Sequence, residues 1–180
     1  MGGNLLLKWL GEQKLQTLLK RAVAVSVPFL LNDCAEKLEQ GLSRIYQTYL
    51  LRLLHKKYND KFSNITSPLA VNVKSLTTFR AFDDQVTAPL NGFNGVDDYY
   101  GRCSCRSFLI NIQTPTLILH SKDDPFMFTT TIPAVDEISD LVTLELTDGG
   151  GHVGFIGGNN PFYPEYWLES RITQFLADKP

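Results

Sequence analysis

Two short segments of the sequence carry residue types that can move a proton. The first, 117–126 (LILHSKDDPF), is an apolar run that ends in two carboxylates, and the second, 148–155 (DGGGHVGF), presents a histidine behind three glycines. A carboxylate that accepts a hydrogen bond from the Nδ1–H of a histidine fixes the tautomer in which Nε2 can take a proton. Such a pair would be the general base, with its orienting acid, for a hydroxyl nucleophile.

Asp124 is the acid that the local pattern favours. It lies just past the end of a predicted strand over 116–120, and open α/β sheets collect their working residues at the carboxyl ends of strands. Pro125 fixes the turn and favours Asp124 over its neighbour Asp123 as the inward carboxylate. The competing interpretation is a solvated Asp-Asp-Pro turn.

His152 is the base that the pattern favours. The glycines at 149–151 precede it and permit unusual backbone angles and a close approach to a reacting group. The competing interpretation is a flexible glycine hairpin with an incidental histidine. His120, at the end of a predicted strand, is more typical of a packed neutral histidine, and His55 lies in a basic helix. The candidate catalytic pair is therefore His152 with Asp124.

No serine of the chain has the surroundings of the nucleophile that this pair would serve. A nucleophile elbow, G-x-S-x-G, places its serine on a sharp strand-to-helix turn, and the motif is absent from the sequence. Ser26 is expected inside a strand, Ser43 at a helix start, and Ser104 between two cysteines. Gly2 and Gly3, in contrast, open a helix, as residues that follow such a serine should. We therefore expect a truncated hydrolase, cut close to its nucleophile and inactive alone.

The elements that would position the pair alternate between helix and strand. Helical periodicity predicts longer helices over 4–12, 33–39, 43–62 and 164–177, and shorter ones over 73–76, 78–86, 96–100 and near 132–133. Apolar runs predict buried strands over 22–27, 116–120 and 141–146. This order is typical of an α/β fold with a mostly parallel sheet. We expect a single domain over 1–180, with a helical cap insert at about 41–112.

The longest predicted helix, over 43–62, is basic and amphipathic. We expect one face of it to carry the apolar side chains Ile45, Tyr49, Leu50, Leu53, Leu54 and Tyr58. Much of the remaining surface carries Arg44, Arg52, Lys56, Lys57 and Lys61. Such a helix can make peripheral contact with a membrane or cover an acyl pocket, and the pattern is equally typical of an ordinary surface helix.

Composition narrows the class of protein. The 180 residues are 43% hydrophobic and 20% charged, which is typical of a soluble globular chain. The formal net charge of -2 gives no electrostatic case for nucleic acid. We expect a cytoplasmic protein, because the sequence has neither a membrane-spanning run nor a leader. The three cysteines form neither a disulfide framework nor a zinc pattern, so no metal is expected.

Five segments, spread along nearly the whole chain, carry a resemblance to known proteins. They are 2–12 (GGNLLLKWLGE), 79–93 (FRAFDDQVTAPLNGF), 98–100 (DYY), 115–127 and 151–155. The combination resembles the YheT-like α/β-hydrolases, a group that includes EMB8-like proteins and ABHD1/ABHD3-type lipases. In that group the elbow reads G-x-S-x-G-G-N. The resemblance therefore puts Met1 directly after the nucleophilic serine and identifies the chain as a C-terminal portion of the fold.

The resemblance implies an enzyme that hydrolyses carboxylic esters, short-chain or lipid, through an acyl-serine intermediate. It implies Asp124 as the triad acid, His152 as the triad base and the backbone N–H of Met1 as one oxyanion-hole donor. It implies neither a metal nor an organic cofactor. The alternative is a catalytically inactive fragment, either a binding or interaction module or a non-functional remnant whose first strand has a bare edge. The oligomeric state is left open.

Overall fold

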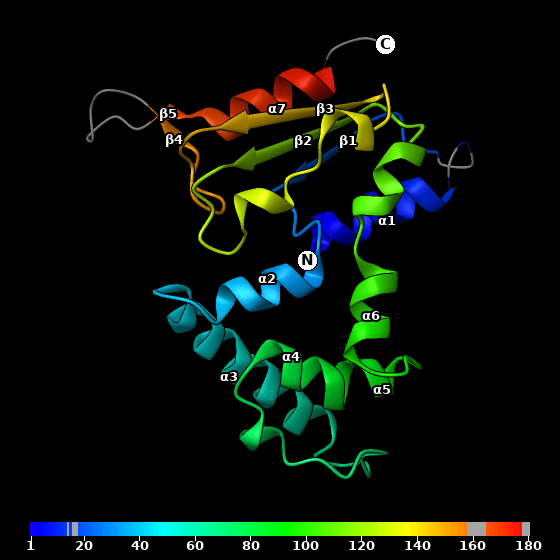
Figure 1. Ribbon diagram of the computed structural model, residues 1–180, viewed down its shortest axis with the longest axis vertical. Coiled ribbons are helices and arrows are strands. Elements are labelled where there is room, and N and C mark those ends of the chain that lie inside the picture. The colour runs from blue at the N-terminus through cyan, green and yellow to red at the C-terminus, as the bar shows by residue number, and fades with distance from the viewer. Residues whose placement is uncertain (14, 16–17, 158–164, 178–180) are drawn as a thin grey trace. The chain divides into compact units, whose positions relative to one another are not determined.

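The described residues of the computed structural model, 1–13, 15, 18–157 and 165–177, fall into two compact units (Figure 1). The sheet unit contains Met1–Phe29 and Ser104–Pro180, and the helical unit contains Leu30–Cys103. The helical unit is thus a single stretch of sequence enclosed between the two parts of the sheet unit. A single hydrolase domain with an insert at about 41–112 stays a prediction.

Three parallel strands form the sheet, in the order β1-β2-β3. They are β1 (Ala22–Val25), β2 (Thr116–Ser121) and β3 (Val142–Thr147). The predicted strands and the parallel α/β fold class are therefore confirmed. Strand β1 ends earlier than expected because Ser26 has a φ of 49° and turns the chain out of the extended conformation. The outer edge of β1 pairs with no other described strand.

Helices cover both faces of this sheet. Helix α1 (Gly2–Gln13) and the 3₁₀ helix η4 (Arg106–Asn111) pack on one face, and α7 (Trp167–Ala177) packs on the other (Figure 1). Alternate residues of β2 point to opposite faces of the sheet. Ile118 packs in the apolar cluster with α1, whereas Leu117 and Leu119 pack in the cluster with α7. The sheet unit is thus a three-layer α/β arrangement.

Helix α1 approaches η4 so closely that one position accepts only glycine. A Cβ built on Gly11 would lie 2.3 Å from the carbonyl oxygen of Phe108. Near the other end of α1, the buried Asn4 accepts a hydrogen bond from the backbone N–H of Cys105 at 2.9 Å. The two contacts fix α1 against the segment that leads into β2.

Two local predictions in the sheet unit need correction. The short helical turn expected to begin at 132–133 begins later, as η6 (Val135–Glu137), and η5 (Thr129–Thr131) precedes it. Ile132 is extended because a proline follows. The terminal helix begins later than predicted, since Glu165–Tyr166 pairs as β5 with β4 (Ile156–Gly157). Positions 158–164, which include the predicted start of that helix, lie outside the described residues.

The helical unit is built from five α-helices, one 3₁₀ helix and one π-helical turn among its described residues. In chain order these are α2 (Leu31–Leu38), α3 (Ser43–Lys61), η2 (Val73–Ser75), α4 (Phe79–Phe82), the π-helical turn η3 (Asp83–Thr87), α5 (Ala88–Leu90) and α6 (Val96–Cys103). Two apolar clusters hold them together, one centred on Leu51 and Phe82 and the other on Ala35 and Tyr100. None of the described helices is both long and apolar enough to cross a membrane.

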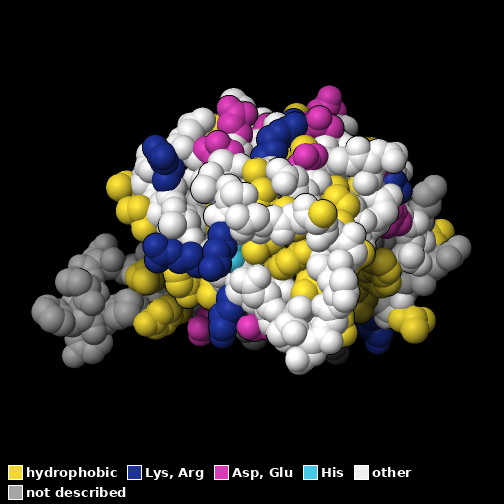
Figure 2. Space-filling model, turned by 90° about the horizontal axis from the view of Figure 1, so that it is seen from below, with side chains coloured by type: hydrophobic (Ala, Val, Ile, Leu, Met, Phe, Trp, Pro, Cys, Tyr) yellow, Lys and Arg dark blue, Asp and Glu magenta, His cyan; other side chains and the backbone are white. Residues whose placement is uncertain are grey.

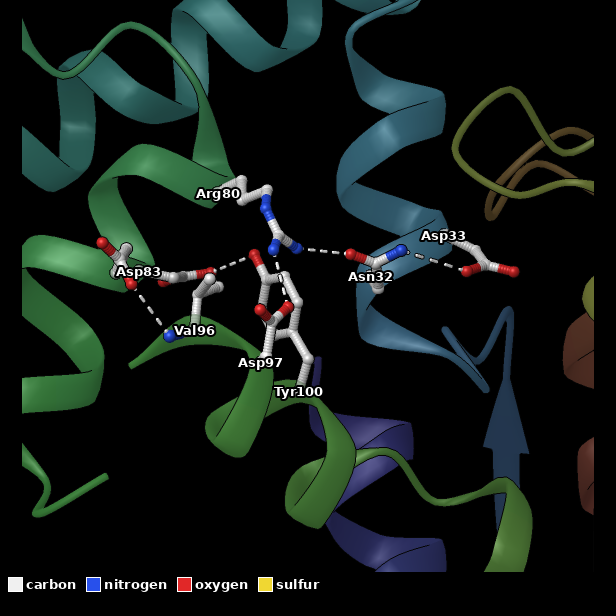
Figure 3. A network of polar contacts seen from close by, with 8 residues as sticks. Asn32, Asp33, Arg80, Asp83, Val96, Asp97 and Tyr100 are labelled. Carbon is white, nitrogen blue, oxygen red and sulfur yellow. Dashed lines mark hydrogen bonds and ion pairs between the residues drawn. The ribbon is translucent and has the colours of Figure 1, made fainter. Parts of the chain in front are cut away.

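A polar network ties α2, α4 and α6 together (Figure 3). The Arg80 guanidinium donates to the side-chain oxygen of Asn32 and to Asp97, both at 2.6 Å. Beside it, the hydroxyl of Tyr100 donates to Asp83 at 2.7 Å. These contacts place the FRAFDD and DYY segments of the sequence in one cluster, where they join helices rather than line a strand end.

The expected common apolar face of α3 is wrong. Ile45, Tyr49 and Leu53 are exposed, whereas Leu54 and Tyr58 pack into the cluster around Leu51. At 100° per residue the row 45-49-53 lies opposite the row 43-47-51, and the second row is the buried one. The prediction failed because it placed the exposed row 45-49-53 on the same face as Leu54 and Tyr58, which pack inward.

Candidate active site

Asp124 occupies a tight turn directly after β2. Its backbone N–H donates to the carbonyl oxygen of Ser121 at 3.3 Å, and its Oδ1 accepts from the backbone N–H of Phe126 at 2.9 Å. The carboxylate side chain is 1% exposed. A buried carboxylate needs hydrogen-bond donors, and this turn provides one of them from its own backbone.

His152 follows β3 in the glycine-rich loop. The backbone N–H groups of Gly154 and Phe155 both donate to the carbonyl oxygen of Gly150, at 3.1 and 3.0 Å, and curl the loop into a tight turn. Gly151 has a φ of 58°, in the left-handed region that glycine adopts without strain. A Cβ on Gly150 would lie 2.9 Å from the Phe155 ring. The glycines therefore permit the curl that presents His152.

The structure brings these two side chains together. Nδ1 of His152 lies 2.9 Å from Oδ2 of Asp124. Because an ionised carboxylate only accepts hydrogen bonds, Nδ1 carries the proton and Nε2 is left as the proton acceptor. The imidazole is 33% exposed, and the Phe126 ring packs at 4.5 Å between centroids. The pair thus combines a buried acid with a base that solvent and ligands can reach.

Ser26, which the sequence pattern placed inside a strand, is instead the first residue after β1. Its hydroxyl donates to the backbone carbonyl oxygen of His152. That bond fixes the histidine's backbone from a second strand end, and it uses the hydroxyl on a carbonyl oxygen rather than on the imidazole. Ser26 is a positioning residue that sequence reasoning missed. The available signal was a small polar residue at the end of an apolar run.

Asp123, the alternative acid, has a different set of partners. It accepts hydrogen bonds from the hydroxyl of Ser121 and, at 2.8 Å, from the backbone N–H of Gly151. These bonds, with that of the Ser121 hydroxyl the stronger, lower the pKa of Asp123 below its usual value. Asp123 is therefore ionised at neutral pH and anchors the glycine loop, while Asp124 contacts the imidazole.

His120 lies at the end of β2, close to this pair. It is 1% exposed, packs against Phe29 at 5.5 Å between ring centroids, and its Nδ1 has no hydrogen-bond partner among the described residues. Burial lowers the pKa of His120, and the nearby Asp124 only partly opposes that effect. His120 is therefore neutral at pH 7, and as a packed histidine it matches the sequence interpretation.

The start of α1 lies at the same end of the sheet. A Cβ on Gly3 would contact Val27 at 2.9 Å and the carbonyl oxygen of Val25 at 3.7 Å, so the first turn presses against the end of β1. Met1 precedes the helix, and its carbonyl oxygen accepts from the backbone N–H of Leu5 at 3.2 Å. Free N–H groups make a helix start electropositive. The first turn of α1 therefore lies beside the end of β1, the strand that Ser26 follows.

Comparison with known proteins gives this arrangement a context. Over 98% of its length, the chain is 42% identical to a protein of Escherichia coli named "Putative esterase YheT", of which it covers 53%. It is 34% identical to phospholipase ABHD3 of Bos taurus over the same share of the chain, covering 43% of that protein. It is also 31% identical to a monoacylglycerol lipase of Saccharomyces cerevisiae, covering 40%. No protein-family model matches the sequence.

The parallel sheet with helices on both faces, together with these likenesses, defines the class: the chain carries part of an α/β-hydrolase fold. Within that class it belongs to the family of ester hydrolases that includes YheT and ABHD3. The family indicated by the sequence resemblance is thereby confirmed. The chain spans 40% to 53% of the length of the three relatives named above.

Proposed function

We propose that this chain supplies the acid and the base of a Ser–His–Asp ester hydrolase. The single observation that carries the proposal is the 2.9 Å contact between His152 Nδ1 and the buried carboxylate of Asp124, at the carboxyl ends of parallel strands. That is the arrangement in which an acid orients a general base. In the proposed enzyme the nucleophile is a serine that precedes Met1, because Gly2–Asn4 match the end of the G-x-S-x-G-G-N pattern.

In the proposed reaction, Nε2 of His152 takes the proton of the serine hydroxyl as its oxygen attacks the ester carbonyl. Asp124 stabilises the imidazolium that forms, and the backbone N–H of Met1, within a longer chain, donates to the oxyanion. The imidazolium then returns its proton to the departing alcohol. Water repeats the sequence on the acyl-serine and releases the carboxylic acid.

The substrate class that we propose is a carboxylic ester, short-chain or lipid. The relatives' names support this choice, since they describe an esterase, a phospholipase and a monoacylglycerol lipase. A Ser–His–Asp hydrolysis of this kind uses no metal and no organic cofactor, and we propose none.

A fusion tests the proposal. The part of the Escherichia coli relative that precedes the aligned region, which should include the elbow serine, is joined to Met1, and hydrolysis of p-nitrophenyl butyrate is measured. The fusion should hydrolyse the ester and react with a fluorophosphonate probe, whereas the chain alone should do neither. His152→Gln should abolish turnover, and His55→Gln, in the helical unit, should leave it unchanged.

Two results would contradict the proposal. Stoichiometric labelling of the unfused chain would mean that one of its own serines is the nucleophile. Full activity of a folded His152→Gln fusion would remove the base from the mechanism. The alternative, a binding module without turnover, requires that the folded fusion retains a fatty acid or ester but does not hydrolyse it.

A further inference from the structure

In the N-terminal half of α3, the longest helix of the helical unit, polar side chains are buried and apolar side chains face the solvent. Ser43 and Gln47 are buried, and Gln47 accepts a hydrogen bond from the backbone N–H of Phe79 at 3.3 Å. On the opposite side, Ile45, Tyr49 and Leu53 are 68%, 59% and 42% exposed. These three repeat every four residues and form one continuous row along α3.

This exposed apolar row continues at the N-terminal end of the helix. Leu42, directly before α3, is 80% exposed. Isolated apolar residues are ordinary on protein surfaces, but a contiguous row marks a surface that contacts something other than water. We call the four residues Leu42, Ile45, Tyr49 and Leu53 the apolar row.

Positive charge surrounds the apolar row. Helix α3 carries Arg44, Arg52, Lys56, Lys57 and Lys61 against one acid, Asp60, in a chain whose formal net charge is -2. All five basic residues are exposed, and none of them forms an ion pair with a described residue. Hydrophobic side chains and Lys or Arg side chains also lie next to each other on the surface shown in Figure 2.

We propose that α3 binds the surface of an anionic lipid bilayer. The apolar row would enter the boundary between headgroups and acyl chains, with Tyr49 at headgroup level. Arg52, Lys56 and Lys57 would lie over the lipid phosphates. The apolar row belongs to the helical unit and the Asp124–His152 pair to the sheet unit, and this inference does not depend on the proposed ester hydrolysis.

The positive charge of α3 favours a lipid surface over a second copy of this chain as the partner of the apolar row. In a symmetric dimer of this chain, α3 would face a copy of itself and bring like charges together, which is unfavourable. A bilayer that contains phosphatidylglycerol offers negative charge and an apolar layer at once. Each basic residue near such a surface strengthens binding by about 1 kcal/mol, or about fivefold, and salt screens the effect.

Flotation with lipid vesicles tests the inference. The full chain is mixed with vesicles of phosphatidylcholine alone, or with vesicles that also contain about 30% phosphatidylglycerol, an anionic lipid. Each mixture is then floated through a density gradient. Bound protein rises with the vesicles, whereas aggregated protein sinks. The chain should rise with the anionic vesicles, at least about tenfold more than with neutral ones, and about 0.5 M salt should weaken this binding.

Two double variants separate the contribution of the apolar row from that of the basic residues. Ile45→Glu with Leu53→Glu should reduce the fraction bound at least about tenfold, because it places charge in the apolar row. Lys56→Glu with Lys57→Glu should do the same through electrostatics. Val135→Glu and Lys74→Glu are the matched controls, since both positions are exposed outside α3 and should leave binding unchanged. Far-UV circular dichroism checks that each variant is folded.

Several results would overturn the inference. They are absence of the folded chain from the floating fraction, equal binding to neutral and anionic vesicles, and equal loss of binding in variants and controls. Sedimentation velocity adds one more. If the chain is a dimer that Ile45→Glu with Leu53→Glu dissociates, and vesicle binding is unaffected, the apolar row is an interface between copies.

Discussion

The two units each hold a carboxylate in a hydrogen-bonded network, and the networks differ in what they leave accessible. In the sheet unit, Asp124 bonds a backbone N–H and the imidazole of His152, which is 33% exposed. In the helical unit, Asp83 bonds the hydroxyls of Thr87 and Tyr100, at 2.6 and 2.7 Å, and Tyr100 is buried. The hydrogen bonds of Asp124 therefore lead to a partly exposed imidazole, whereas those of Asp83 lead to two hydroxyl groups within the helical unit.

This difference teaches how the same residue type takes on two roles. A carboxylate that holds an imidazole can orient it for proton transfer and can thereby take part in catalysis. A carboxylate bonded only to hydroxyls has no such partner, because their protons are lost only at high pH. Burial raises the pKa of Tyr100 far above its usual value, and the Asp83 charge adds to this effect. The Asp83 network therefore joins helices, whereas the Asp124 network is a candidate for chemistry.

The strongest test of this contrast compares Asp124→Asn with Asp83→Asn in the esterase fusion. Asp124→Asn should lower kcat by about 10⁴-fold, because an amide at this position favours the wrong histidine tautomer. Asp83→Asn should leave kcat within about threefold while lowering stability, since it lies in a structural network. Initial rates with p-nitrophenyl butyrate measure the first effect, and thermal unfolding measures the second. A large loss of kcat in a stable Asp83→Asn variant would remove the distinction.

A stability test acts on the sheet unit through Gly11. Gly11→Ala should destabilise this unit by about 3 kcal/mol, because its Cβ would overlap the Phe108 carbonyl 2.3 Å away. Gly101→Ala, in α6 with nothing within 4 Å, should be neutral or stabilising by up to about 1 kcal/mol. Hydrogen exchange followed by mass spectrometry localises each change. Equal protection of α1 in the two variants would contradict the packing described here.

A smaller effect is expected in the helical unit from the Tyr100 hydroxyl. Tyr100→Phe removes the bond to Asp83 and should cost about 1 to 2 kcal/mol, because a polar partner is left unsatisfied. Tyr99→Phe is the matched control, since the Tyr99 hydroxyl has no hydrogen-bond partner among the described residues. Urea unfolding monitored by hydrogen exchange in α6 measures both. Similar losses in the two variants would mean that ring packing, not the hydroxyl, stabilises this network.

Sequence reasoning was most successful where local pattern and global fold agree. The buried strands are continuous apolar runs bounded by Pro or turn residues, so their positions and parallel pairing followed directly. The contact between Asp124 and His152 was predicted because open α/β sheets collect functional residues at the carboxyl ends of their strands. Other features depend on tertiary contacts that have no local signal. The hydroxyl of Ser26 finds the His152 carbonyl across 126 residues of sequence, and the exposure of Ile45 depends on which row of α3 packs inward.

The smallest expected effect is a difference in pH dependence between the units. Burial raises the pKa of Asp83, so above its ordinary value of 3.8 the folded form binds more protons than the unfolded form. Local stability of the helical unit should therefore fall as pH rises through the window above 3.8. In the sheet unit, the Arg106 guanidinium lowers the pKa of Glu137 to about 2 from 4.5. Stability near η6 should therefore be lost as pH falls from 4.5 toward 2.

Opposite slopes in the two units would support the contrast between a desolvated acid and an ion-paired one. Hydrogen exchange between about pH 3 and 6, the range in which carboxyl groups titrate, corrected for intrinsic rates, measures local stability in α6 and near η6. Asp83→Asn should flatten only the first profile and Glu137→Gln only the second. The Glu137 effect should be the weaker, because that ion pair is partly exposed and salt screens it. Slopes of the same sign in both units would contradict these assignments, because the two carboxyl groups shift in opposite directions.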